Sequence, residues 1–145
     1  MKRLLLYVHF NKYDHISRHV FYQLEHMRPL FDKLVFISNS RLSESEVQKL
    51  RDKHLIDDFI QRENKGYDFA AWHDGMEFIR FDNLKQYDSV TVMNDTCFGP
   101  LWEMAPIYDK YESNPKVDFW GMTNHQGIKA GDIYIHEHLQ SYFIS

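Results

Sequence analysis

Several residue types and motifs are scarce in this sequence, and each scarcity excludes a class of protein. A single cysteine, Cys97, leaves neither a disulfide framework nor a zinc site built on cysteine pairs. The longest apolar runs, at residues 4–8 and 34–37, are far shorter than the ~20 residues that cross a bilayer. Lys and Arg number 17 against 21 Asp and Glu, so the positive excess of a nucleic-acid-binding domain is missing. We therefore expect a cytoplasmic protein with no transmembrane segment and no nucleic-acid partner.

The usual phosphate-binding and nucleophile motifs are absent as well. The sequence has no G-x-G-x-x-G, no G-x-x-x-x-G-K-[ST] and no G-x-S-x-G. These absences argue against dinucleotide-binding enzymes, P-loop enzymes and the commonest serine hydrolases. Cys97 lies beside Phe98, a setting more typical of a small buried residue than of a nucleophile.

What is present suits one folded domain, because 145 residues with 43% hydrophobic content can build one core. Apolar runs predict strands, and apolar spacings of three or four between them predict helices. The expected strands are residues 3–10, 34–38, 58–62, 89–93 and 117–122. Two helices are expected at residues 17–28 and 106–112, and a third begins with a capping box formed by Ser43 and Glu46. A fourth helix is expected to be capped by Asp68 and to bury Phe69, Trp72, Met76 and Ile79. Residues 123–132 are expected to form a loop. This alternation predicts an α/β fold with three layers, in which helices cover both faces of a mainly parallel twisted sheet.

Polar residues lie at the carboxyl end of each of the first four expected strands. They are His9 and Asn11, Ser38 and Asn39, Arg62 to Asp68, and Asn94 to Thr96. Ligands of parallel sheets bind at the carboxyl ends of the strands, so these residues are candidates for a binding site.

Two of these segments carry the most information. In Arg62-x-Asn64-x-Gly66-Tyr67-Asp68, an arginine can bind phosphate or a base edge, and glycine permits close approach of a ligand. An ordinary strand-to-helix turn with an Asp cap explains the same residues equally well. In Asn94-Asp95-Thr96, the carboxylate can hold a divalent cation, although an Asx turn has the same composition.

Together the segments resemble the rhamnan synthesis F family. The resemblance is carried by R-x-N-x-G-Y-D-x-x-x-W at residues 62–72, N-D-T-x-F-G-P at 94–100, W-G-M-T at 120–123 and H-x-Q-S-Y-F at 138–143. It covers essentially the whole chain. It implies a glycosyltransferase related to the GT-A nucleotide-sugar transferases, which moves rhamnose from dTDP-rhamnose to a growing surface polysaccharide or lipid-linked glycan, at the inner face of the membrane or in the cytoplasm.

By matching positions, the resemblance also implies the site. The nucleotide sugar would contact His9, Asn11, Ser38, Asn39, Arg62, Asn64, Gly66, Asp68, Asn94 and Asp95. Asn94-Asp95-Thr96 would occupy the place of the D-x-D metal motif, with one carboxylate rather than two. Asp95 would therefore hold Mg²⁺ or Mn²⁺, or contact only the ribose or the sugar. Residues 1–145 would form a single nucleotide-sugar-binding domain, the donor half of a longer enzyme. Asp132, Glu137 and His138 are the late candidates for a base, and none is assigned.

Two other interpretations stay open. A non-catalytic module that binds nucleotide sugar or polysaccharide fits the short chain and the missing second carboxylate. A generic three-layer domain of the flavodoxin or receiver type fits the alternation of elements. It explains neither polar segment, and the acidic cluster that a receiver carries after its first strand is absent.

Overall fold

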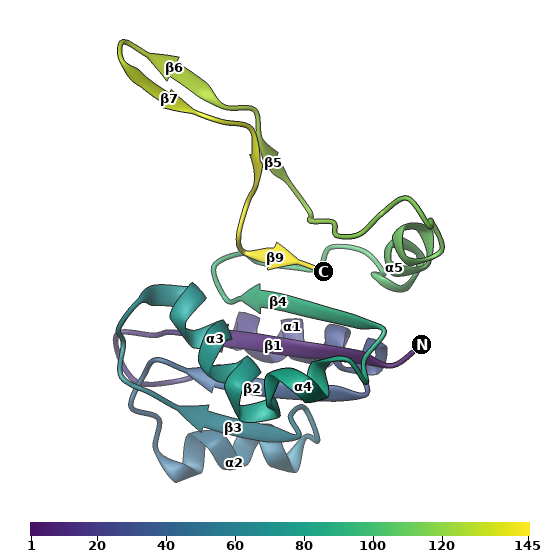
Figure 1. The fold of residues 1–145 in the computed structure, drawn as a ribbon. Coiled ribbons are helices and arrows are strands. Elements are labelled where there is room, and N and C mark those ends of the chain that lie inside the picture. The colour runs from purple at the N-terminus through teal and green to yellow at the C-terminus, as the bar shows by residue number, and fades with distance from the viewer.

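A five-stranded sheet forms the centre of the structure, with its strands in the order β3-β2-β1-β4-β9 (Figure 1). The computed structural model describes all residues, 1–145. The strands are β1 (Arg3–His9), β2 (Lys33–Ser38), β3 (Asp58–Gln61), β4 (Ser89–Asn94) and β9 (Phe143–Ile144). Neighbours among β1 to β4 pair in parallel, and β9 pairs with β4 in the antiparallel direction. The expected α/β fold with a mainly parallel sheet is confirmed.

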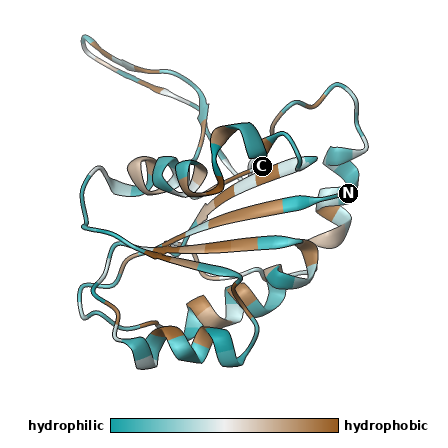
Figure 2. Ribbon diagram, turned by 60° about the horizontal axis from the view of Figure 1, so that its bottom comes forward, coloured by the Kyte–Doolittle hydropathy of each residue, from teal (hydrophilic) through white to brown (hydrophobic).

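Helices cover both faces of this sheet. On one face α1 (Arg18–Met27), α2 (Glu44–Asp52) and α5 (Ala105–Glu112) contribute to the core, and a 3₁₀ turn (Arg28–Leu30) follows α1. On the other face lie α3 (Tyr67–Ile79) and the short α4 (Phe81–Leu84). β1 is central and buried on both sides: Leu5 and Tyr7 face α1, while Leu6 faces α3. Figure 2 accordingly shows the central strands as largely hydrophobic.

The start of α2 differs from a complete capping box. Ser43 is the N-cap, and its Oγ accepts a hydrogen bond from the Glu46 amide at 3.3 Å, as expected. The Glu46 carboxylate does not return to Ser43. It accepts a hydrogen bond from the Ile16 amide at 2.8 Å instead, and so ties α2 to the loop after β1.

The expected cap of α3 at Asp68 is wrong. The N-cap is Gly66, whose φ of +73° starts the helix from a left-handed conformation that glycine adopts without strain. Asp68 lies in the first turn, where its side chain accepts a hydrogen bond from Asn94. Phe69 was expected in the core but is 67% exposed, because Ala71, Trp72 and Gly75 form the buried face of the helix. Trp72 is buried as expected.

The expected strand at residues 117–122 is also wrong. β9 occupies the place beside β4, so this segment forms just one bridge, from Gly121 to Ile144. Trp120 exchanges two backbone hydrogen bonds with Ser145, at 2.8 and 2.9 Å. Its ring stacks on Tyr111 at 5.1 Å and meets Tyr108 edge-on at 4.9 Å. The segment is therefore held by this one pair of backbone hydrogen bonds and by aromatic packing against α5, and it forms no strand beside β4.

Residues 123–132 were expected to be loop but contain strands. β5 (Asn124–His125) pairs with β8 (His138–Leu139), and β6 (Ile128–Ala130) pairs with β7 (Ile133–Ile135). The β6–β7 hairpin points away from the sheet (Figure 1), and all six of its strand residues are exposed. The turn residues of this region were recognised as loop, and the short strands that they connect were not.

Candidate functional site

The ends of β1 and β2 form a rigid polar junction. His9 is fully buried, its Nδ1 lies 3.0 Å from the Ser38 hydroxyl, and its ring stacks on Phe36 at 5.4 Å. Burial lowers the pKa of His9 to about 4, so the ring is neutral at pH 7. The Asn39 amide donates to the His9 carbonyl at 2.8 Å. His9 and Ser38 thus shape this edge of the sheet from beneath its surface.

The two loops above this junction are bonded to each other through Asn11. Its amide donates to Ser40 Oγ at 2.7 Å, and its side-chain nitrogen donates to Ser17 Oγ at 3.0 Å. Its side-chain oxygen accepts from the Tyr13 amide at 2.8 Å. Asn11 therefore fixes the path of the β1–α1 loop.

Arg62, directly after β3, binds three different parts of the chain. Its Nε donates to the Asp74 carboxylate on α3 at 2.6 Å, and one terminal nitrogen donates to Asn39 Oδ1 at 2.7 Å. The other donates to the Lys65 carbonyl at 3.0 Å. The guanidinium lowers the pKa of Asp74. Arg62 joins the ends of β2 and β3 to α3, an anchoring role that its sequence position did not reveal.

A polar groove opens over the ends of β2 and β3. Its volume is about 730 Å³, and none of its eight lining residues is hydrophobic. They are Asp14, Asn39, Arg41, Gln61, Arg62, Glu63, Asn64 and Lys65. The exposed side chains of Arg41, Asn64 and Lys65 can meet a ligand directly. Of these residues, sequence reasoning singled out Asn39, Arg62 and Asn64. Arg41 was missed although it follows the polar end of β2 directly.

Gly66 begins α3 beside this groove, and its backbone conformation explains the residue. A Cβ at this position would lie 2.5 Å from the Ala70 Cβ, in addition to the strain of the positive φ. Tyr67 also has a positive φ, of +52°, and its side chain is 82% exposed.

The end of β4 brings two carboxylates to the same edge. Asn94 is buried, and its side-chain nitrogen donates to Asp68 Oδ2 at 2.7 Å. Asp95 follows it and accepts a hydrogen bond from the Phe10 amide at 3.0 Å. Burial raises the pKa of Asp95 to about 6, and the nearby negative charge of Asp68 adds to the shift. Asp68, from α3, is thus a second carboxylate close enough to Asp95 to influence its ionisation.

The predicted site residues therefore fall into two neighbouring groups. His9, Asn11, Ser38, Asn39, Arg62 and Asn64 shape or line the polar groove. Asp68, Asn94 and Asp95 form the second group, in which the Asn94 amide bonds to Asp68; the two carboxylates, Asp68 and Asp95, are here called the carboxylate pair. The bond between Phe10 and Asp95 joins β1 to this second group, and Gly66 lies between the two in sequence.

Comparison with known proteins places this arrangement in a family. Residues 34–145 match the family described as rhamnan synthesis protein F, which is most of the chain and includes both polar segments that follow β3 and β4. The chain belongs to the rhamnan synthesis protein F family. Two curated relatives are similar: the uncharacterized protein y4gN of Sinorhizobium fredii, 30% identical over 86% of this chain, and the virulence protein VirA of Vibrio anguillarum, 31% identical over 75%.

The chain spans about 30% of the length of these two relatives. No solved structure matches it. None of its helices combines the length and the apolar content that a membrane-spanning helix needs. The family membership that the sequence motifs suggested is confirmed.

The late candidates for a base lie away from the groove in this family member. Asp132 is in the turn of the projecting β6–β7 hairpin (Figure 1). Glu137 accepts a hydrogen bond from Asn124 at 2.7 Å, and His138 stacks on His125 at 5.2 Å. Their contacts hold the base of the hairpin together.

Other reactive groups are less suited to a role in the site. Burial raises the pKa of the Cys97 thiol, which keeps it protonated at neutral pH. His73, Asp74 and Glu77 on α3 place their ligand atoms within 4.8 Å of one another, but Asp74 is engaged by Arg62 and the other two are exposed. The carboxylate pair is the better candidate for a cation.

Replacing Arg62 with glutamine is expected to lower the free energy of unfolding by about 1–3 kcal/mol, since acceptors on Asn39 and Asp74 lose a charged donor. Urea denaturation measures this change. Arg18→Gln is the matched control, because Arg18 is exposed and makes no side-chain hydrogen bond. An Arg62 variant as stable as this control would contradict the anchoring role.

Proposed function

We propose that this chain is the nucleotide-sugar-binding domain of a glycosyltransferase, the donor half of a longer enzyme that transfers rhamnose from dTDP-rhamnose to a cell-surface polysaccharide. The observation that carries the proposal is the meeting of a wholly polar groove and a carboxylate pair at the carboxyl edge of a parallel sheet, in a member of the rhamnan synthesis protein F family. A GT-A-like architecture, with its action in the cytoplasm or at the inner face of the membrane, is part of the proposal.

The polar groove has the chemistry that a nucleotide diphosphate needs. Arg41 and Lys65 offer exposed positive charge to the diphosphate, and the exposed amide of Asn64 offers hydrogen bonds to a base or a ribose. Arg62 holds the floor of the groove through Asn39, so the binding surface is formed before the ligand arrives. A preformed surface loses less conformational entropy when it binds.

The carboxylate pair has the chemistry that Mg²⁺ or Mn²⁺ needs. Both ions prefer oxygen ligands, which Asp68 and Asp95 offer. The raised pKa of Asp95 shows that its negative charge is poorly compensated within the protein. This fits a position where a cation supplies the compensation. When bound there, the cation would neutralise charge on the departing diphosphate.

In the proposed reaction an acceptor hydroxyl attacks the anomeric carbon of the sugar, and the bond to the nucleotide diphosphate breaks. The charge that develops on the leaving oxygen would be stabilised by the cationic side chains of the groove. Asp68 would orient the site through Asn94, whose amide it holds at 2.7 Å. No residue of this chain is assigned as the base that takes the hydroxyl proton.

Calorimetry with dTDP-rhamnose, dTDP and UDP-sugars tests the proposal. We expect binding that strengthens with Mn²⁺ and weakens with EDTA. Asp95→Asn and Asp68→Asn should each remove the dependence on Mn²⁺, because each deletes one carboxylate of the pair. Asp82→Asn, on the exposed surface of α4, is the matched control. Absence of binding by every nucleotide up to millimolar concentration would overturn the proposal.

A non-catalytic binding module is the second candidate, favoured by the position of Asp132, Glu137 and His138 away from the groove. The two candidates differ in turnover. Release of dTDP from dTDP-rhamnose by the longer protein, in the presence of acceptor, supports the transferase. Tight nucleotide-sugar binding without release, and without any effect of Mn²⁺, supports the module.

A further inference from the structure

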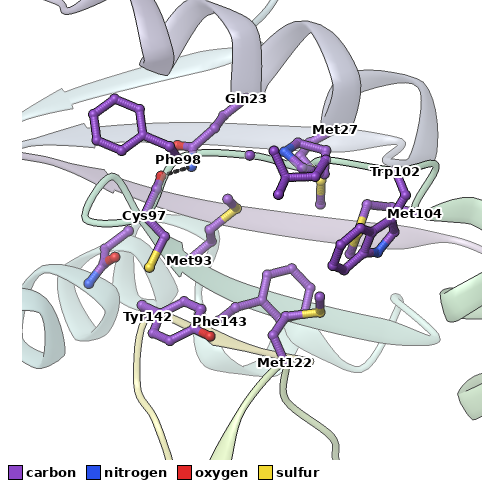
Figure 3. Close-up of a pocket in the computed structure, with 14 residues that line it drawn as sticks. Gln23, Met27, Met93, Cys97, Phe98, Trp102, Met104, Met122, Tyr142 and Phe143 are labelled. Atoms are coloured by element: carbon purple, nitrogen blue, oxygen red, sulfur yellow. Dashed lines mark hydrogen bonds between the residues drawn. The ribbon is translucent and has the colours of Figure 1, made fainter.

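A second cavity lies beside the carboxylate pair, and its chemistry is the opposite of the polar groove. It has a volume of about 260 Å³, and ten of its fourteen lining residues are hydrophobic. Four methionines, Met27, Met93, Met104 and Met122, come from four separate parts of the chain and surround it together with Trp102 (Figure 3). We call it the methionine pocket. Methionine side chains are flexible and polarizable, so such a wall adapts to ligands of variable shape.

Apolar side chains continue from this pocket onto the surface. Phe98, Leu101 and Trp102 line it and are 77%, 79% and 58% exposed. Isolated exposed apolar residues are common, but three within five positions at the mouth of an apolar cavity form a continuous surface. The apolar surface is therefore longer than the cavity itself.

The loop that carries these side chains is held in place by α1. The Gln23 side-chain nitrogen donates to the Cys97 carbonyl, as Figure 3 shows, and the Tyr22 hydroxyl donates to the Pro100 carbonyl at 3.0 Å. The Phe98 ring lies 4.6 Å from the His19 ring. The exposure of the loop's apolar side chains is thus fixed by neighbouring contacts.

The pocket and the carboxylate pair share a wall. Asn94 lines the pocket, and the same side chain donates to Asp68 at 2.7 Å. Asp95 follows Asn94, and Cys97, two residues further on, lines the pocket again. A ligand with a polar end at the carboxylates therefore reaches the pocket at its Asn94 and Cys97 wall.

We propose that the methionine pocket binds the hydrocarbon chain of an amphiphilic sugar acceptor, whose polar end lies at the carboxylate pair. This inference rests on the proposed function for the identity of the polar end. A flexible chain fits better than a compact ring, because the apolar surface runs from the enclosed methionines to the exposed Leu101 and Trp102. The occupant is a single alkyl or isoprenoid chain, bound as one molecule.

A series of alkyl β-glucosides tests this, each kept below the concentration at which it forms micelles. Methyl, hexyl, octyl and decyl glucoside share one head group, so that only the chain changes. We expect the affinity, measured by calorimetry and by tryptophan fluorescence, to rise roughly fourfold for each buried methylene until the apolar surface is filled. Methyl glucoside should bind weakly or not at all. An affinity that does not depend on chain length would overturn the proposal.

Two variants locate the chain. Leu101→Asp places a charge at the pocket mouth on an exposed side chain, and we expect it to weaken decyl glucoside binding at least tenfold. Ile133→Asp makes the same change on the exposed β7 strand, and it should leave the affinity unchanged. If both variants weakened decyl glucoside binding equally, or if neither did, the assignment of the hydrocarbon chain to the methionine pocket would be contradicted.

Two further measurements separate this inference from its alternatives. If the protein bound phosphatidylglycerol vesicles but no monomeric glucoside, the proposed role of the methionine pocket would be overturned. The exposed apolar side chains of the loop would then dock on a bilayer instead. Asp95→Asn should abolish the effect of Mn²⁺ on dTDP-rhamnose, whereas Asp82→Asn, on the exposed surface of α4, should change neither that effect nor the affinity for decyl glucoside. If the protein bound decyl glucoside but no nucleotide, the assignment of the methionine pocket would stand and the proposed function would be refuted. If it bound nucleotide but no glucoside, only the assignment of the pocket would be refuted.

Discussion

Replacing Trp72 with alanine is expected to lower the free energy of unfolding by roughly 3–5 kcal/mol, because the change leaves a large cavity between α3 and the sheet. Trp72 is 3% exposed and packs in the cluster that includes Leu6 and Ile37. Its indole nitrogen also donates to the Met93 carbonyl at 3.3 Å, a bond that links α3 to β4. Urea denaturation followed by circular dichroism measures the loss.

Phe69→Ala is the matched control for this change. Phe69 touches the edge of Trp72 at 5.2 Å but is 67% exposed, so its loss should have a much smaller effect. A Trp72 variant as stable as the Phe69 variant, but with lost nucleotide affinity, would show that Trp72 serves the ligand rather than the core. The sequence pattern placed both aromatic residues in the core, and the comparison measures how differently the two contribute to stability.

Replacing Asp95 with asparagine is expected to stabilise the metal-free protein at pH 7 by about 3 kcal/mol. Ionisation of this carboxyl is disfavoured in the folded protein, where its pKa is about 6 instead of the ordinary 3.8. Each unit of difference corresponds to about 1.4 kcal/mol. Asparagine carries no charge and can still accept the hydrogen bond from the Phe10 amide.

The gain should depend on pH in a defined direction. Because the pKa is raised on folding, wild-type Asp95 favours the folded state below about pH 4, and that contribution is lost as the pH rises through 6. The difference between variant and wild type should therefore be largest at pH 7 and close to zero near pH 4. Urea titrations in EDTA at both pH values measure it. An asparagine variant less stable than wild type at pH 7 would show that Asp95 is a structural residue.

In the wild-type protein, the contribution of His9 to stability changes with pH in the direction opposite to that of Asp95. Its pKa is lowered from 6.5 to about 4, so its contribution to stability is complete above pH 6.5 and is lost as the pH falls toward 4. In wild type, protonation of Asp95 offsets this loss over the same range. In the asparagine variant the offset is gone, and acid should destabilise the protein more steeply.

Local sequence patterns were sufficient to predict the parallel strands of the sheet. β1 and β2 are uninterrupted apolar runs since both of their faces are covered, and that signal does not depend on distant residues. The segment at 117–122 is also mostly apolar, although Asp118 and Gly121 interrupt it. It packs through Trp120 against α5 instead of forming a strand beside β4, because two residues near the end of the chain occupy that place. Such competition between distant segments leaves no mark in the segment itself.

The candidate site, like the fold, could be predicted only in part from the sequence. The rule that ligands meet the carboxyl ends of parallel strands found both polar segments, and it needs only the order of the elements. It did not show that Arg62 binds Asn39 and Asp74, or that Asp68 reaches Asn94, because those contacts depend on how α3 is placed on the sheet. The start of α3 at Gly66 rather than Asp68 is what leaves the Asp68 carboxylate available to Asn94.

The central position of β1 also shapes the order in which the protein folds. Leu4 pairs with Lys33 on one side and with Val90 on the other, so one neighbour of β1 is close in sequence and the other is remote. Closing the longer loop loses more chain entropy before any contact is gained, which slows the pairing. β1, β2 and β3 can therefore form first, together with α1 and α2, while the edge of β1 that later pairs with β4 is still unpaired. β4 completes the carboxylate pair only when it docks on that edge, so the binding edge is among the last parts of the sheet to form.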